Sequence, residues 1–235
     1  MAIHYKNSFY KKGLNQKETQ MKKSLLFIIS IMLLTSLFTS CASKEKPPRE
    51  RDETYIADIN MFTVETFNLY SAFGMGQPKV QDFTFIFEPR TNYLYVRGRI
   101  GIDQVEAAFS YKERQKILAA KDMYILEYET DNLTKKKPSK KNAYNTGSVP
   151  IRWGVAGLGH STTTTYMTNV QYILKDKPYF RILFSPSKED DGSENSSPKA
   201  MVYISPAQWE KIIEACNQER LVELTDAILE EADEF

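Results

Sequence analysis

Residues that could do nucleophilic or acid–base chemistry are few in this chain. It has two histidines and two cysteines, and nucleophilic catalysis needs a serine or cysteine beside a base such as histidine. His160 lies next to Ser161 in GLGHSTTTT, but this stretch lacks the second glycine of a G-x-S-x-G turn. We therefore interpret His160 as a histidine in a surface turn, and we predict that the protein is not an enzyme.

The residue types also limit cofactors. Zinc takes several Cys, His or carboxylate ligands, and His160 with one free thiol, Cys216, does not supply the usual set. Gly154, Gly157 and Gly159 are spaced G-x-x-G-x-G, which is neither the dinucleotide-binding fingerprint nor a P-loop. The sequence thus predicts no metal and no cofactor. We expect Cys216 to be a small core residue on a helix.

The other cysteine, Cys41, follows an apolar run. The run LLFIISIMLLTSLF, residues 25–38, carries no charge and is shorter than the roughly 20 residues that cross a bilayer. A positive start followed by such a run is typical of a secretory signal, and Lys22 and Lys23 supply the positive start. We predict a signal peptide over residues 1–40. Residues 1–20 are either a long positive region or an extension ahead of a start at Met21.

The boundary LFTSC, residues 37–41, resembles the lipobox of bacterial lipoproteins, in which leucine and small residues precede a cysteine. The resemblance implies cleavage after Ser40 and a diacylglyceryl group on the Cys41 thiol, with a fatty acid such as palmitate on the new amino group. Two or three chains anchor a protein stably. The sequence departs from the strict pattern at Phe38, where leucine is usual. The alternatives are a membrane helix or a cleaved signal with an incidental cysteine.

The residues after Cys41 are polar. ASKEKPPRERDE, residues 42–53, contains Pro47 and Pro48, and charged, proline-rich chains stay extended. We interpret residues 41–60 as a lipidated cysteine and flexible tether. Without residues 1–40, the chain has 25 basic and 29 acidic residues, a formal charge of −4. Its length fits one large domain or two small ones.

The remaining chain alternates strand-like runs with turn residues, and helices follow. Four runs between residues 61 and 110 precede the SYKE sequence at Ser110, which predicts a capped helix to about Tyr128. We expect this helix to turn an apolar face to the core, made of Ile117, Leu118, Ala120, Tyr124 and Ile125. Four more runs lie between residues 150 and 204, and SPAQ predicts a second helix capped by Ser205. We expect an α+β fold with antiparallel sheets. The two ββββα halves are either a duplication or an order that arose by chance.

The halves are bounded as residues 61–130 and 149–235. Residues 131–148, DNLTKKKPSKKNAYNTGS, are rich in lysine and turn residues and are predicted to form a linker. The second half ends in an acidic helix, Glu219–Glu234, with an apolar stripe at Leu221, Leu224, Ile228 and Leu229. This stripe either packs on the domain or binds a partner.

The order of four strands and a helix, twice, resembles the Whirly and PUR-type proteins that bind single-stranded nucleic acids. Aromatic residues interleaved with arginine suit base stacking and phosphate contact. Alternation places such side chains on one face of two strands: Tyr93, Tyr95, Arg97 and Arg99 on the first, and Tyr179 and Arg181 on the second. The other interpretation is an ordinary sheet face in which arginine covers tyrosine, and we favour it because a charge of −4 repels phosphate.

From these features we expect an exported lipoprotein of the bacterial cell envelope, anchored by lipid to the inner or outer membrane. Its role is predicted to be non-catalytic, either structural or in binding an envelope protein or component that the sequence does not identify. The alternative is a single-stranded nucleic-acid binding protein of Whirly or PUR-like architecture.

Overall fold

The computed structural model describes residues 55–233, except 101–102, 134–138, 156–159, 191 and 193. Eight strands, three α-helices and one 3-10 turn form in this part of the chain. In order they are β1 Phe62–Phe73, β2 Lys79–Glu88, β3 Tyr93–Ile100, β4 Asp103–Phe109, α2 Tyr111–Glu129, η1 Lys140–Asn142, β5 Asn145–Val155, β6 Ser161–Leu174, β7 Lys177–Phe184, β8 Ala200–Ile204, α3 Pro206–Cys216 and α4 Gln218–Asp233.

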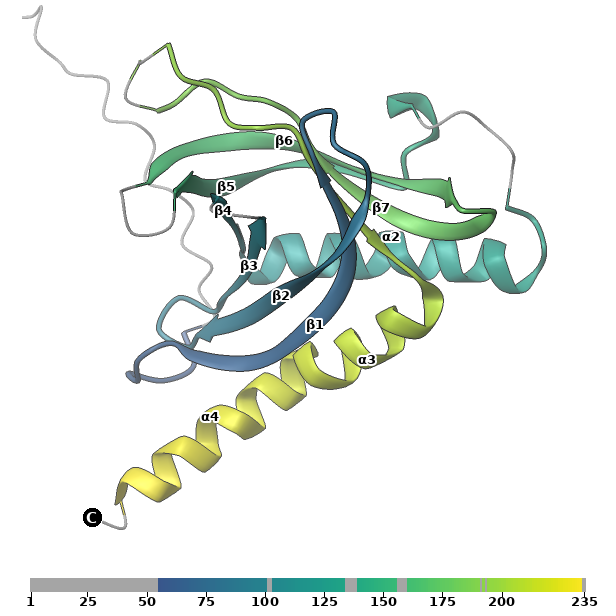
Figure 1. The fold of residues 1–235 in the computed structure, drawn as a ribbon. Helices are drawn as coiled ribbons and strands as arrows, with labels where there is room; N and C mark the ends of the chain where they lie inside the picture. The colour runs from purple at the N-terminus through teal and green to yellow at the C-terminus, as the bar shows by residue number, and fades with distance from the viewer. Residues whose placement is uncertain are drawn as a thin grey trace, which may run out of the picture. The chain divides into compact units, whose positions relative to one another are not determined.

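The eight strands form one closed antiparallel barrel (Figure 1). Each strand pairs with its neighbours in chain order, and β1 pairs with β8. Helix α2 lies between β4 and β5 in the chain, but these two strands still pair with each other. Their ladder runs from Asp103 opposite Val155 to Ala107 opposite Ile151. All the strands therefore belong to a single sheet that curves round on itself.

The predicted fold class, α+β with antiparallel sheets in two ββββα halves, is wrong. The strand runs lie where the alternation predicted them, but the two sets of four do not form separate sheets, since β4 pairs with β5 and β8 with β1. Inward side chains from both sets meet in one core, for example Phe87 from β2 and Phe180 from β7. The alternation of apolar and polar residues identifies the buried face of a strand. It does not indicate which other strand pairs with each of its edges.

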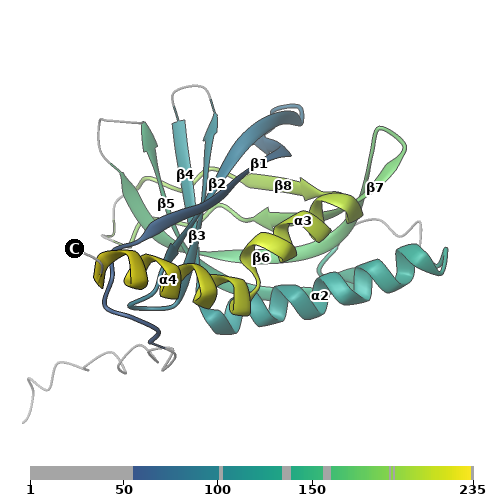
Figure 2. The same cartoon turned by 90° about the horizontal axis from the view of Figure 1, so that it is seen from below.

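The closure between β1 and β8 is short. Only Tyr70–Phe73 pair with β8, opposite Tyr203 to Ala200, whereas the β1–β2 ladder runs from Phe62 to Ser71. Strand β8 stops at Ile204, and Ser205 caps α3 directly after it. Helix α3 therefore lies beside the lower part of β1 (Figures 1 and 2).

Both predicted helix caps are present. The Ser205 hydroxyl accepts from the Gln208 amide, and the Gln208 side chain accepts from the Ser205 N–H, as the predicted capping box requires. The Ser110 hydroxyl likewise accepts from the Glu113 amide at 3.2 Å. It also donates a hydrogen bond to the Glu113 carboxylate. Helix α4 begins one residue before the predicted final helix.

The helices cover the barrel with their apolar faces. Ile117, Ala120 and Tyr124 of α2 and Leu221 of α4 are buried in the barrel core. The rest of the predicted α4 stripe is only partly covered. None of the helices in the described part of the chain combines the length and the hydropathy that crossing a membrane requires.

Two predicted boundaries differ from the observed ones. Strand β5 begins at Asn145, inside the stretch predicted as a linker, and Asn145 lies opposite Asn169 of β6. The last residues of the predicted tether contact the turn between β2 and β3, because the Ile56 N–H donates to the Pro89 carbonyl at 3.1 Å.

Gly98 tests the packing of the barrel wall. It lies opposite Phe83 in the β2–β3 ladder, and a Cβ at this position would come within 2.9 Å of three carbons of the Phe83 ring. We expect Gly98→Ala to lower the free energy of unfolding by about 1–3 kcal/mol through overpacking, as measured by urea denaturation.

Gly147 provides the control, since its added Cβ would meet only the Met167 methyl at 3.9 Å. Gly147→Ala should leave stability unchanged or raise it by up to about 1 kcal/mol, because alanine restricts the unfolded chain. Equal losses in the two variants would contradict the packing described here.

Candidate binding site: an apolar cavity under the barrel

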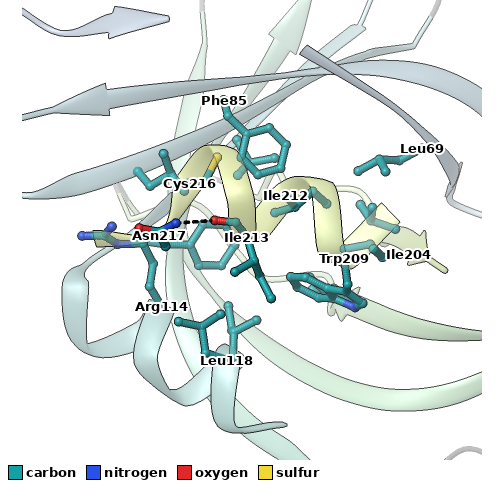
Figure 3. Close-up of a pocket in the computed structure, with 16 residues that line it drawn as sticks. Leu69, Phe85, Arg114, Leu118, Ile204, Trp209, Ile212, Ile213, Cys216 and Asn217 are labelled. Atoms are coloured by element: carbon teal, nitrogen blue, oxygen red, sulfur yellow. Dashed lines mark hydrogen bonds between the residues drawn. The ribbon is translucent and has the colours of Figure 1, made fainter. Parts of the chain in front are cut away.

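A cavity of about 100 Å³ lies between the inner wall of the barrel and the helices α2 and α3 (Figure 3). Leu69, Val202 and Ile204 line it from the strands, and Leu118 and Ile213 line it from the two helices. Of its sixteen lining residues, all but Arg114 and Asn217 are apolar. Protein interiors rarely leave a space much larger than one water molecule, so this cavity marks a gap in the packing.

The cavity exists because helices replace strand pairing at this end of the barrel. Helix α3 follows β8 immediately, and it places Trp209, Ile212 and Ile213 against the barrel interior. The spacing of these residues puts them on one helical face. Trp209 also packs edge-on against Phe180, with 5.3 Å between ring centroids.

Arg114 is the charged residue of the cavity wall, and it is buried. Its guanidinium donates to the Asn92 carbonyl at 3.0 Å and to the Gln218 side chain at 3.1 Å, and it lies 5.6 Å from the ring centroids of Phe87 and of Tyr111. Arg114 thereby connects α2, the β2–β3 turn and the start of α4. It fixes the rim of the cavity.

The second polar residue of the wall is also engaged. The Asn217 amide donates to the Ile213 carbonyl at 2.9 Å, and its oxygen accepts from the Arg220 N–H at 2.8 Å. It therefore ends α3 and caps α4. The Trp209 indole N–H is buried and has no hydrogen-bond partner among the described residues. The rest of the lining is apolar, which suits an apolar ligand.

Cys216 contributes a thiol to the same wall. Burial raises its pKa to about 12, Arg114 acts in the opposite direction, and Glu65 adds to the rise. Since the thiolate is the nucleophilic form, this thiol is unreactive at neutral pH. Its place on α3 among apolar residues matches the core role predicted for it.

His160 is exposed beside the start of β6. Among the residues that the structure describes, no group of three or more His, Cys, Asp or Glu side chains could hold a metal ion.

On β3, the predicted binding face lies within a network on the outer wall. Glu106 of β4 receives Arg97 at 2.7 Å and Arg152 of β5 at 3.2 Å, while the Tyr95 hydroxyl donates to Glu88 at 2.8 Å. Burial, and then that hydrogen bond, raises the pKa of Tyr95. Tyr93 packs beside Tyr95, with 6.2 Å between their ring centroids, and Arg99 is exposed at the end of the row.

The β7 part of the predicted face belongs to a separate cluster. Arg181 lies 4.7 Å from the ring centroid of Tyr172, and Tyr179 packs edge-on against Tyr70 at 5.9 Å. Burial lowers the pKa of Arg181 and raises that of Tyr203, its hydrogen-bonding partner. The order of strands in the barrel puts three strands between β3 and β7 in either direction. The structure therefore does not bring the two predicted parts together.

The predicted lipidation and cleavage residues, Cys41 and Ser40, lie outside the described residues. Sequence reasoning missed the cavity, although it placed Ile117 and Leu118 of α2 toward the core. Its lining comes from six strands and two helices, and no local pattern marks such a set.

In fold and site, this is a closed eight-stranded barrel with an apolar cavity between its interior and two helices. The chain belongs to the family described as "Uncharacterised Treponema protein", whose model matches residues 11–223. It is 28% identical over 210 residues to a protein of Treponema pallidum (strain Nichols) described as "Uncharacterized protein", a match covering 86% of this chain and 70% of that protein. No solved structure matches it significantly.

The raised pKa of Cys216 can be tested by alkylation. In residues 42–235, where Cys216 is the single cysteine, the iodoacetamide rate should rise about tenfold per pH unit from pH 7 to 10 without levelling off, because the thiol remains mostly protonated below pH 12. In urea, the same thiol should level off above about pH 9, near its ordinary pKa. A plateau near pH 9 in the folded protein would contradict the burial of the thiol.

Proposed function

We propose that this protein is an exported, membrane-anchored, non-catalytic binding protein of the bacterial cell envelope. We further propose that its barrel binds a small apolar group, such as the end of an alkyl chain, in the cavity between α2, α3 and the inner wall. The observation that carries the second proposal is the apolar lining, in which Arg114 and Asn217 are hydrogen-bonded to other residues of the protein.

The size of the cavity limits the ligand. A cavity of about 150 Å³ admits benzene, which has six carbon atoms, so a cavity of about 100 Å³ has room for about four carbon atoms. Only the end of a longer molecule would fit, and the rest would pass between α2 and α3 past Leu118 and Ile213. An apolar chain end also suits a protein held at a membrane.

Support for the anchor comes from the sequence. An uncharged run of signal length precedes Cys41, and a polar tether follows it. A single-stranded nucleic acid is a weaker candidate ligand. The tyrosine and arginine side chains that would stack on bases lie on well-separated strands, and Arg97 and Arg181 already contact side chains of the protein itself.

Binding can be tested with brominated fatty acids, because bromine quenches tryptophan fluorescence on contact. Trp153→Phe leaves Trp209, which lines the cavity, as the single tryptophan. We expect 12-bromododecanoic acid to quench Trp209 strongly and 2-bromododecanoic acid to quench it weakly, because only the chain end enters the cavity.

Filling the cavity supplies the control. The double variant Leu118→Phe and Ile213→Phe should weaken binding at least tenfold. Leu126→Phe, on the exposed face of α2, should leave binding unchanged. Equal quenching by the two acids, or equal binding by both variants, would contradict an apolar site at this position.

The anchor predicts covalent lipid at Cys41. Cells given labelled palmitate should show label on the wild-type protein in the membrane fraction, and Cys41→Ser should abolish the label and retain the uncleaved signal. Cys216→Ser should keep the label. An unlabelled wild-type protein of uncleaved mass in the cytosol would refute the lipoprotein proposal.

A further inference from the structure

A second hollow, of about 650 Å³, lies along β1 where β8 has ended. Five consecutive residues of β1, Val64–Asn68, line it on one side, and residues of α3 and α4 line it on the other. Alternate side chains of a strand point to opposite faces, so a hollow over one face would be lined by every second residue. Lining by consecutive residues means that the groove follows the edge of the strand.

This edge of β1 has no strand beside it in the described part of the chain, because the β8 ladder covers only Tyr70–Phe73. Its backbone groups are met by side chains instead. The Glu65 carboxylate accepts from the Thr66 N–H at 3.3 Å, and the Gln208 carboxamide donates to the Asn68 carbonyl at 2.8 Å. Thr66 and Asn68 are two residues apart, as expected for groups pointing to the same edge of a strand.

The contact with Gln208 shows that the edge of β1 can bind an amide group. A carboxamide is chemically equivalent to a peptide group, and here it makes the bond that the N–H of a neighbouring strand would make. Exposed strand edges pair readily with extended chains. Five residues of extended chain span about 17 Å, which matches the five residues of β1 that line the groove.

The charges in the groove suit a peptide of mixed charge. Lys211 and Glu214 of α3 are exposed, as is Glu65 of β1. None of the three forms an ion pair with another residue that the structure describes. Arg220 of α4 already pairs with Glu223 at 3.1 Å. An acidic side chain beside Lys211 and a basic one beside Glu65 would complement the groove.

We propose that this groove binds an extended segment of a partner protein, about five residues long, that pairs with the β1 edge as an added strand. The segment places an acidic side chain beside Lys211 and a basic one beside Glu65. This site is distinct from the apolar cavity and does not depend on the function proposed for it.

The test uses the full chain in lipid nanodiscs and fluorescein-labelled heptapeptides of alternating valine and threonine, with one aspartate and one lysine in either order. Binding is followed by fluorescence polarisation. Thr66→Pro removes the edge N–H, and proline is tolerated where a strand N–H faces away from the sheet. Thr66→Ala removes the same side chain and keeps the N–H. We expect Thr66→Pro to weaken binding at least tenfold and Thr66→Ala to leave it within twofold.

Two further measurements keep the proposal testable if Thr66→Pro does not fold. Peptides N-methylated at alternate residues, in each of the two phases, have the same side chains but lack backbone donors, and the phase that blocks pairing should bind wild type at least tenfold more weakly. Lys211→Glu should weaken binding, and replacing the peptide aspartate with lysine should restore it.

The proposal would be overturned if neither peptide bound, or if both methylated phases bound as well as the parent. It would also be overturned if the wild-type chain formed a dimer without peptide that Thr66→Pro abolished, since the edge would then belong to a second copy.

Discussion

Ser205 and Pro206 end strand β8 after five residues, and that stop limits the length over which β8 can close the barrel against β1. Proline has no N–H to donate to a ladder and its fixed φ suits the first turn of a helix, while Ser205 and Gln208 satisfy each other's backbone groups in a capping box. The chain therefore leaves the sheet when only four residues of β1 have been paired. Below that point a helix takes the place that a longer β8 would have occupied.

Two faces of helix α3 consequently contact different parts of the molecule. Trp209, Ile212, Ile213 and Cys216 face the barrel interior and line the apolar cavity, whereas Gln208, Lys211 and Glu214 face the unpaired edge of β1. These spacings of three and four residues separate the apolar and polar sides of one helix. A helix presents side chains where a strand would present backbone groups. The helix therefore leaves a gap inside the barrel and, among the residues that the structure describes, an edge of β1 with no strand beside it. Arg114 holds the surrounding elements in place.

The tyrosine and arginine side chains of the outer wall show which features the local sequence pattern can predict and which it cannot. Alternation correctly put Tyr95 with Arg97 and Tyr179 with Arg181 on shared strand faces. It could not indicate that β3 and β7 lie on different sides of the barrel, or that Glu106 reaches Arg97 and Arg152 across three strands. Arginine side chains on this wall pack over neighbouring tyrosine rings, as Arg181 does over Tyr172. These contacts cover the outer surface of the barrel.

The sequence by itself determined the strands, the helices and their caps, because side-chain periodicity and capping bonds act over a few residues. From the sequence one could also anticipate the buried positions Ile117, Ala120 and Tyr124. Only the tertiary structure decided that β4 joins β5 and that β1 joins β8, since backbone pairing at a strand edge is nearly independent of residue type. The cavity and the β1 groove depend on those pairings and on the short β8, and so they too were decided by the tertiary structure.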